Sequence, residues 1–90
     1  MLDVVLSSRF KKDLKTAARR GYNFAILNDV VDQLARRELL PERNRDHALT
    51  GEYEGCRECH LAPDWLLVYQ INDNELVLYL MRTGTHSDLF

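Results

Sequence analysis

The residues best suited to chemistry in this 90-residue chain lie in one short stretch, which runs from His60 through Asp64 to Trp65. An imidazole can transfer a proton near neutral pH, a carboxylate can orient or charge-stabilise it, and an indole can stack on a nucleobase. Pro63 interrupts the stretch. Because proline cannot donate to a sheet ladder, it predicts a bulge or turn that re-aims the neighbouring side chains. Alone, this hexapeptide is more typical of a loop with a buried tryptophan and two solvated polar residues than of a catalytic site.

The first half of the chain predicts one strand followed by two helices that must support this stretch. Residues 2–6 form a short apolar run with two valines, which is typical of a strand. Ser7 or Ser8 can cap a helix whose apolar residues recur at i, i+4 and i+7. Asn23 can cap a second amphipathic helix, which we expect Pro41 to stop. The short link between the helices predicts an antiparallel helix hairpin.

The second half of the chain predicts three strands with short connections. A polar loop over residues 42–51 comes first, and the strands are expected over residues 53–61, 65–71 and 75–82. The order β-α-α-β-β-β predicts an α+β fold, in which the two-helix hairpin packs on a small, mainly antiparallel sheet. The length predicts one domain over residues 1–90.

All three histidines, His47, His60 and His86, fall at predicted strand edges or in loops rather than within an apolar stripe. In an antiparallel meander, the start of the 65–71 strand and the end of the last strand lie close together. Four residues are therefore expected to converge at one end of the sheet, namely Asp64, Trp65, Arg82 and His86. His60, just before the proline, can join them there.

The two cysteines form a motif that we reject as a metal or haem site. Cys56, Cys59 and His60 fit the C-x-x-C-H pattern of covalent haem attachment, and His47 would complete a four-ligand zinc set. Haem attachment needs export, and no signal peptide is evident. In an extended strand, Cys56 and Cys59 point to opposite faces. We therefore expect the cysteines to be small apolar filler, with no metal and no cofactor.

Composition and charge restrict the setting and the partners. No apolar run approaches the ~20 residues of a membrane span, so no membrane association is expected and a cytoplasmic location with reduced cysteines is the default. The formal net charge is −2, whereas nucleic-acid-binding proteins usually carry a positive surplus. Charge alone thus argues mildly against an RNA partner. Only the basic face of the first predicted helix, with Lys11, Lys12 and Lys15, is suited to binding phosphate.

Two longer stretches resemble the signatures of the YafQ-type toxins in the RelE superfamily. The central signature is matched by Asp46-His47-x-Leu49-x-Gly51-x-Tyr53-x-Gly55-x-Arg57-Glu58-x-His60-Leu61-x-x-Asp64-Trp65-Leu66-Leu67-x-Tyr69. The C-terminal signature is matched by Arg82-Thr83-Gly84-Thr85-His86-Ser87-Asp88-Leu89-Phe90. The two stretches span about half of the chain, and the preceding β-α-α order also fits this family.

The resemblance implies a RelE-like fold and a bacterial type II toxin, inhibited by a cognate antitoxin within a toxin–antitoxin hetero-oligomer. Such toxins enter the ribosomal A site and cleave mRNA there. By motif position, the resemblance assigns substrate stacking to Trp65 and Phe90. It assigns the catalytic set, including the arginine that contacts phosphate, to His47, His60, Asp64, Arg82 and His86.

These residue types agree with metal-independent RNA cleavage. A base must take the 2′-OH proton, an acid must protonate the leaving 5′-oxygen, and positive charge must stabilise the phosphorane. We expect His86 to be the general acid and either His60 or Asp64 to be the general base. His47 would position or protonate the phosphate, and Arg82 would stabilise it.

Two other functions remain open at this point. A ParE-like toxin shares the fold but poisons DNA gyrase without needing convergent histidines, so the three histidines count against it. A catalytically silent module would retain antitoxin binding alone. RNA cleavage separates the endoribonuclease from both alternatives.

Overall fold

The computed structural model describes residues 1–90 and begins with strand β1 (Asp3–Leu6), followed by helices α1 (Ser8–Arg19) and α2 (Phe24–Ala35). Polar side chains start both helices. The Ser7 hydroxyl accepts a hydrogen bond from the Phe10 amide at 3.0 Å, and the Asn23 side chain accepts one from the Ala25 amide at 3.0 Å. Each cap satisfies one amide that lacks a partner in the first helical turn. The predicted helix starts are confirmed.

Helix α2 ends earlier than predicted, and Pro41 does not stop it. The helix finishes at Ala35, and Arg37 adopts a left-handed conformation with φ of 61°. The Arg37 and Glu38 amides then donate to the carbonyls of Leu34 and Gln33. This pattern of C-terminal capping usually uses glycine at the left-handed position, so the arginine gave no signal in the sequence.

The sheet has five strands in the order β1-β5-β4-β3-β2. Strand β1 pairs with β5 in parallel, and the other pairs are antiparallel, so the predicted mainly antiparallel sheet is confirmed. The last three strands are β3 (Arg57–Ala62), β4 (Trp65–Asn72) and β5 (Val77–Gly84). The predicted 53–61 strand starts too early, because residues 51–53 form a 3-10 turn, and β5 runs two residues past its predicted end.

Two short elements were not predicted. Strand β2 (His47–Ala48) pairs with the edge of β3 inside the predicted polar loop, after a 3-10 turn over Glu42–Asn44. Helix α3 (His86–Leu89) follows β5. Both are too short for a periodic pattern to reveal them. Both carry a histidine, so the unpredicted elements help to build the candidate site.

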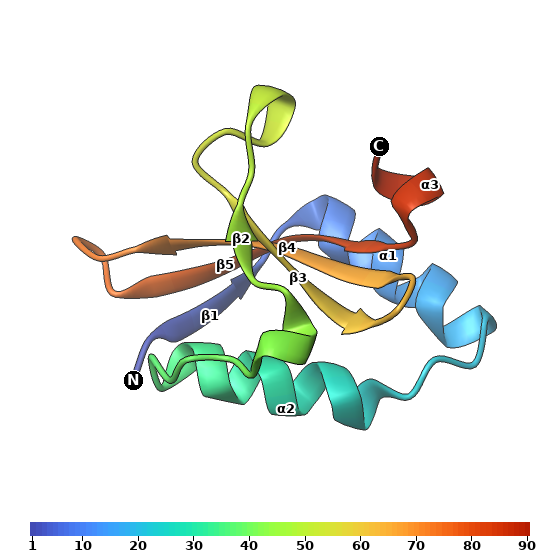
Figure 1. Cartoon of the computed structure of the whole chain (residues 1–90), viewed down its shortest axis with the longest axis horizontal. Coiled ribbons are helices and arrows are strands. Elements are labelled where there is room, and N and C mark those ends of the chain that lie inside the picture. The colour runs from blue at the N-terminus through green and yellow to red at the C-terminus, as the bar shows by residue number, and fades with distance from the viewer.

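The two faces of the sheet have different covers (Figure 1). Helices α1 and α2 contribute Phe10, Leu27 and Leu34 to the main core, which continues through Cys59 and Leu67 of the sheet. A smaller cluster of Cys56, Leu66, Val68 and Leu89 lies elsewhere, with α3 on the side of the sheet away from α2. None of the helices is long and apolar enough to cross a membrane.

Candidate active site

The candidate site lies on the face of the sheet that carries the smaller cluster. His60 lies across from Leu66, Glu58 lies across from Val68, and both apolar partners belong to that cluster. Directly opposite residues share a face of a sheet, as do residues two apart in one strand. Glu58 and His60 of β3 therefore point to the same side, whereas Cys59 between them enters the helix-covered core.

Helix α3 brings the third histidine onto this face. Thr85 and Asp88 form a capping box, in which the Thr85 hydroxyl accepts from the Asp88 amide and the Asp88 carboxylate accepts from the Thr85 amide. Arg20 donates to the same carboxylate at 2.6 Å, which ties α3 to the end of α1. Gly84 permits this approach, because a Cβ there would lie 2.8 Å from the Asp88 carboxylate. His86 is the first residue of the helix so anchored.

His86 is held by two hydrogen bonds to one oxygen. Its backbone amide lies 3.0 Å from Asp64 Oδ1, and its ring Nδ1 lies 2.7 Å from the same atom. A carboxylate can only accept, so the proton is on Nδ1 and Nε2 is free for chemistry. These two bonds also hold the pKa of Asp64 below its ordinary value, which keeps Asp64 ionised. Asp64 therefore orients His86.

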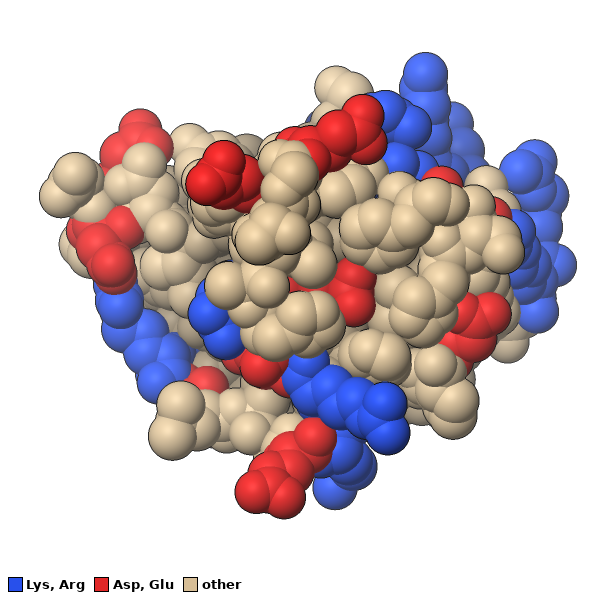
Figure 2. Space-filling view, turned by 45° about the horizontal axis from the view of Figure 1, so that its top comes forward, with Lys and Arg blue, Asp and Glu red and all other residues tan.

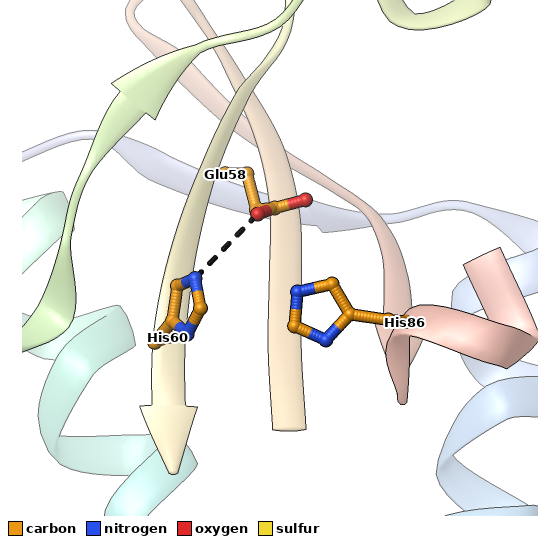
Figure 3. Close-up of side chains that lie close together, drawn as sticks. All are labelled: Glu58, His60 and His86. Atoms are coloured by element: carbon orange, nitrogen blue, oxygen red, sulfur yellow. Dashed lines mark ion pairs between the residues drawn. The ribbon is translucent and has the colours of Figure 1, made fainter. Parts of the chain in front are cut away.

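A buried carboxylate lies between the other histidines. Glu58 is only 4% exposed, and its Oε1 lies 3.8 Å from Nε2 of His60 and 3.6 Å from Nε2 of His47. The His60 and His86 rings are 5.6 Å apart at their centroids. Figure 3 shows both rings below the Glu58 carboxylate, one from β3 and one from α3. His60, Asp64 and His86 lie close together, as expected from the sequence. Glu58, which was not expected, joins them.

Arg82 is not free to meet a phosphate as expected. Its guanidinium makes two hydrogen bonds to the Asp13 carboxylate, at 2.8 and 3.1 Å, and its side chain is 11% exposed. Helix α1 continues along the β5 edge beyond the end of β1, so Asp13 also accepts from the Thr83 amide. The ion pair raises the pKa of Arg82 and neutralises its charge locally. What remains toward the site is a 3.4 Å contact with the Tyr53 hydroxyl.

Trp65 does not present its indole for stacking on a base. The side chain is 4% exposed and belongs to the main core, with its ring 4.8 Å from that of Tyr22 and 6.4 Å from that of Phe24. Asp64 lies in the turn before β4, and although it lines one pocket together with Trp65, the indole itself turns into the helix-covered core. Phe90 is different, because it is 62% exposed and packs edge-on against Tyr53.

An arginine-flanked pocket of about 370 Å³ opens beside His60. Arg43 and Arg45 line it from the loop between α2 and β2, and both side chains are exposed. The Asn44 amide between them donates to the His60 carbonyl at 2.7 Å, which fixes the loop to β3. Two cations therefore lie next to the imidazoles. The three lysines of α1, Lys11, Lys12 and Lys15, are exposed on the helix.

The two cysteines lie in separate clusters, Cys56 in the smaller one and Cys59 in the main core. Burial raises the pKa of the Cys59 thiol to about 12. Because the two thiols lie in separate clusters, neither haem attachment nor a shared zinc site fits this arrangement, although Cys56 lies just before β3 rather than within the predicted strand.

Comparison with known proteins identifies the family. The family model of the bacterial YafQ toxin of type II toxin–antitoxin systems matches residues 2–90. This chain belongs to the YafQ toxin family. The mRNA interferase toxin YafQ of Escherichia coli K12 is 37% identical over 89 residues, which cover 98% of this chain and 95% of that protein.

Solved structures of the YafQ family and similar toxins share the fold over the whole chain. A metal-bound toxin from Helicobacter pylori has a TM-score of 0.94 and 46% identity, and covers 100% of both chains. In the E. coli DinJ–YafQ complex, the matching chain has a TM-score of 0.90 and 35% identity, over 100% of this chain and 99% of that one. The predicted RelE-like α+β fold is thus confirmed.

Several residues around the site of this YafQ-family chain are not predicted from the sequence. Glu58 stood inside the quoted signature, and its position two residues before His60 in a strand was the available signal. Asp13 and Arg82 are far apart in the sequence, so nothing local linked them. Arg43 and Arg45 lay in a loop whose path no periodicity reveals.

Proposed function

We propose that this chain is an mRNA interferase toxin, an endoribonuclease that cleaves mRNA in the ribosomal A site and so inhibits translation. The observation that carries the proposal is the pair of imidazoles 5.6 Å apart, one of them oriented by Asp64. Membership of the YafQ family, with an mRNA interferase at 37% identity, gives the substrate class.

The two imidazoles act as acid and base, and no metal takes part in the reaction. His60, beside the Glu58 carboxylate, takes the proton of the 2′-OH. His86, with Nδ1 bound to Asp64, uses Nε2 to protonate the leaving 5′-oxygen. Each transfer requires the nitrogen to come within about 3 Å of its oxygen, and it typically contributes about 10²- to 10⁴-fold to the rate. The product carries a 2′,3′-cyclic phosphate or a 3′-phosphate.

Asp64 orients His86 in this scheme, so of the two candidate bases only His60 keeps that role. His47 positions the phosphate from the other side of Glu58, with its Nδ1 fixed by the Arg45 carbonyl at 2.7 Å. Arg82, paired with Asp13, positions Tyr53 rather than contacting the phosphate.

The RNA backbone is held by cations that have no partner in an ion pair. Arg43 and Arg45 line the pocket at His60, and in this proposal they bind phosphates next to the scissile bond. Phe90 offers an exposed ring for stacking on a base. Lys11, Lys12 and Lys15 bind ribosomal RNA, which a chain of net charge −2 can approach only through its basic end.

The partner is a cognate antitoxin, as in the DinJ–YafQ complex of E. coli, and the toxin acts in the cytoplasm where ribosomes are. An apolar groove of about 390 Å³ between α1, α2 and β1 is the surface that the antitoxin covers. It is lined almost wholly by hydrophobic side chains, among them Val4, Leu14 and Val31.

The test is primer extension on an mRNA translated in a cell-free system, with wild type and His86→Ala side by side. Discrete in-frame cuts that need ribosomes and vanish in the variant are expected. His86 is exposed on a surface helix, so the variant should fold. Cuts without ribosomes would reject the A-site mechanism. Translation without any cut would favour the gyrase-poisoning or silent-module alternative, and a gyrase supercoiling assay separates those two.

A further inference from the structure

Asn44 is a buried polar residue between two exposed arginines. It is 6% exposed and ends the 3-10 turn before β2, whereas Arg43 and Arg45 on either side reach solvent. An amide buried away from water needs a hydrogen-bond partner, and Asn44 Nδ2 donates to the His60 carbonyl at 2.7 Å. The buried amide therefore links the loop before β2 to the strand that carries the proposed base.

The Asn44 side chain takes the place of a strand amide at the edge of β3. Strand β2 begins at His47, so its pairing with β3 stops there. In the same antiparallel register, the Arg45 amide would donate to the His60 carbonyl. It donates to the Glu42 carbonyl instead, at 2.9 Å, and Arg45 is left-handed with φ of 47°. The chain thus leaves the sheet at Arg45, and the Asn44 side chain supplies the missing bond.

The same bond fixes a further site residue through the backbone. The Arg45 carbonyl accepts a hydrogen bond from His47 Nδ1 at 2.7 Å. Because Arg45 follows Asn44 directly, a shift of Asn44 moves the acceptor that orients the His47 ring. Arg43, on the other side of Asn44, lines the pocket at His60 together with Arg45. Three groups that face the RNA in the proposed function therefore depend on one buried amide.

The two imidazoles that transfer protons are held independently of Asn44. His60 lies across from Leu66 in the antiparallel pair of β3 and β4, and His86 is bound to Asp64. Without the Asn44 hydrogen bond, the loop would move while these two rings stay in place. Binding of the RNA backbone and proton transfer can therefore be separated by experiment.

We propose that Asn44 is a positioning residue for the cleavage reaction. It holds the loop over residues 43–47 against β3, so that the basic side chains of this loop meet the RNA backbone beside His60. It acts through its neighbours and not by contact with the RNA. The contact of the loop with RNA rests on the proposed function, whereas the attachment of the loop to β3 does not.

Cleavage kinetics separate this role from a general loss of stability. Asn44→Ala should raise the KM for ribosomes programmed with a labelled mRNA by at least about 10-fold, because the loop loses charge-assisted hydrogen bonds to phosphate. The kcat should change by less than about 3-fold, since the lost interactions are made in the ground state as well as in the transition state. Asn74→Ala, the same change in the exposed β4–β5 turn, is the matched control and should cleave like wild type. An unchanged KM for Asn44→Ala would overturn the proposal.

A second background shows whether Asn44 acts through the arginines. When Arg43 and Arg45 are both replaced with alanine, adding Asn44→Ala should raise the KM by less than about 3-fold further, because residues that act as one unit are not additive. A full additional increase would overturn this route of action.

The position of the loop is tested without RNA. Long-range ¹H–¹⁵N spectra of the full chain should show the His47 ring nitrogens shifting in Asn44→Ala, whereas the His86 ring, bound to Asp64, should not shift. Asn44 belongs to neither core cluster, so the variant should fold, and urea denaturation checks this. Asn44→Leu, an apolar variant of similar shape, should give the same shift.

An unshifted His47 ring in both variants would overturn the positioning role, whatever the kinetics. If the ring shifts as expected but wild type never cleaves RNA, the proposed function is rejected and the attachment of the loop is upheld.

Discussion

At the scale of single residues, the two nitrogens of the His86 ring have different surroundings. Nδ1 is bound to Asp64, and Nε2 is free. Asp64→Asn should therefore lower the single-turnover cleavage rate by about 10²- to 10⁴-fold, because an amide neither stabilises the imidazolium nor enforces this tautomer. The residues are both exposed, so thermal unfolding should be nearly unchanged. Full activity of Asp64→Asn would leave Asp64 without a role in the chemistry.

The Asp13–Arg82 pair should matter for stability. Both side chains are mostly buried, at 15% and 11% exposure, and the carboxylate also accepts from the Thr83 amide. Asp13→Ala leaves a buried guanidinium unpaired, so the free energy of unfolding should fall by about 2 to 4 kcal/mol. Urea denaturation of the wild type and of Asp13→Ala measures this difference in the free energy of unfolding. Asp29→Ala, which changes an exposed carboxylate of α2, is the control and should have little effect.

The sequence predicts which residue types form the site. It does not predict which of their side chains are free and which are paired or buried. Histidines at the ends of strands were visible as such, and alternation along β3 separates Cys59 from its neighbours. Arg82 is paired with Asp13, and the Trp65 ring packs against Tyr22. Both partners lie far away in the sequence. Whether a guanidinium is free or paired is decided by such long-range contacts, which no local pattern encodes.

At the scale of elements, the position of helix α3 depends on the charge of the Asp88 carboxylate. Arg20 and the Thr85 amide hold the pKa of Asp88 far below its ordinary value of 3.8. A carboxyl whose pKa is lowered by folding stabilises the fold above its unfolded pKa, and this contribution is lost as the pH falls through the folded pKa.

Asp88→Asn should therefore lower the stability at pH 7, and its difference from wild type should shrink progressively as the pH falls below about 3.8. Urea titrations across this range measure the difference. Glu52→Gln, an exposed carboxyl in a turn, serves as the control. A difference that stays constant with pH would mean that the charge of Asp88 does not anchor α3.

The apolar groove is lined by residues of four elements, α1, α2, β1 and β5, and a residue at its exposed edge can be used to test it. Val4 lines the groove and is 43% exposed, so Val4→Asp should be tolerated by the fold. A charge there should weaken the complex with the antitoxin by at least about 10-fold, because the aspartate would be desolvated on binding. Binding is measured by titration with the co-expressed antitoxin. Leu39→Asp, at a residue 96% exposed outside the groove, should bind like wild type.

Caps and apolar stripes could be read from the sequence because each acts over a few residues. Ser7 and Asn23 start the helices for this reason. The end of α2 could not be read, because a left-handed arginine takes the place usually held by glycine. Strand β2 is two residues long and is defined by its partner β3 rather than by its own composition.

At the scale of the whole molecule, charge is unevenly distributed. Figure 2 shows basic side chains gathered on the side where α1 lies, whereas acidic and basic groups alternate elsewhere. Replacing Lys11, Lys12 and Lys15 with alanine should weaken ribosome binding. It should also reduce the salt dependence, by about 0.7 in the log–log slope for each phosphate that the variant no longer neutralises. Sedimentation with ribosomes at several KCl concentrations measures both.

The control for the lysine variant is Arg36→Ala, which removes a basic residue paired with Glu38 at the end of α2. Ribosome binding by this variant should match wild type. An unchanged slope for the triple lysine variant would mean that the basic face of α1 is merely solvated.

The parallel pairing of β1 with β5 has a consequence for synthesis. The Ser7 hydroxyl donates to the Met81 carbonyl, 74 positions later, so the first strand has no sheet partner until nearly the whole domain has been made. Such distant pairing is slow to form. A nascent chain that lacks β5 has neither a complete sheet nor the segment that carries His86. With His86 as the proposed acid, we expect a nascent chain to cleave no RNA until residues 77–86 have emerged from the ribosome that made it.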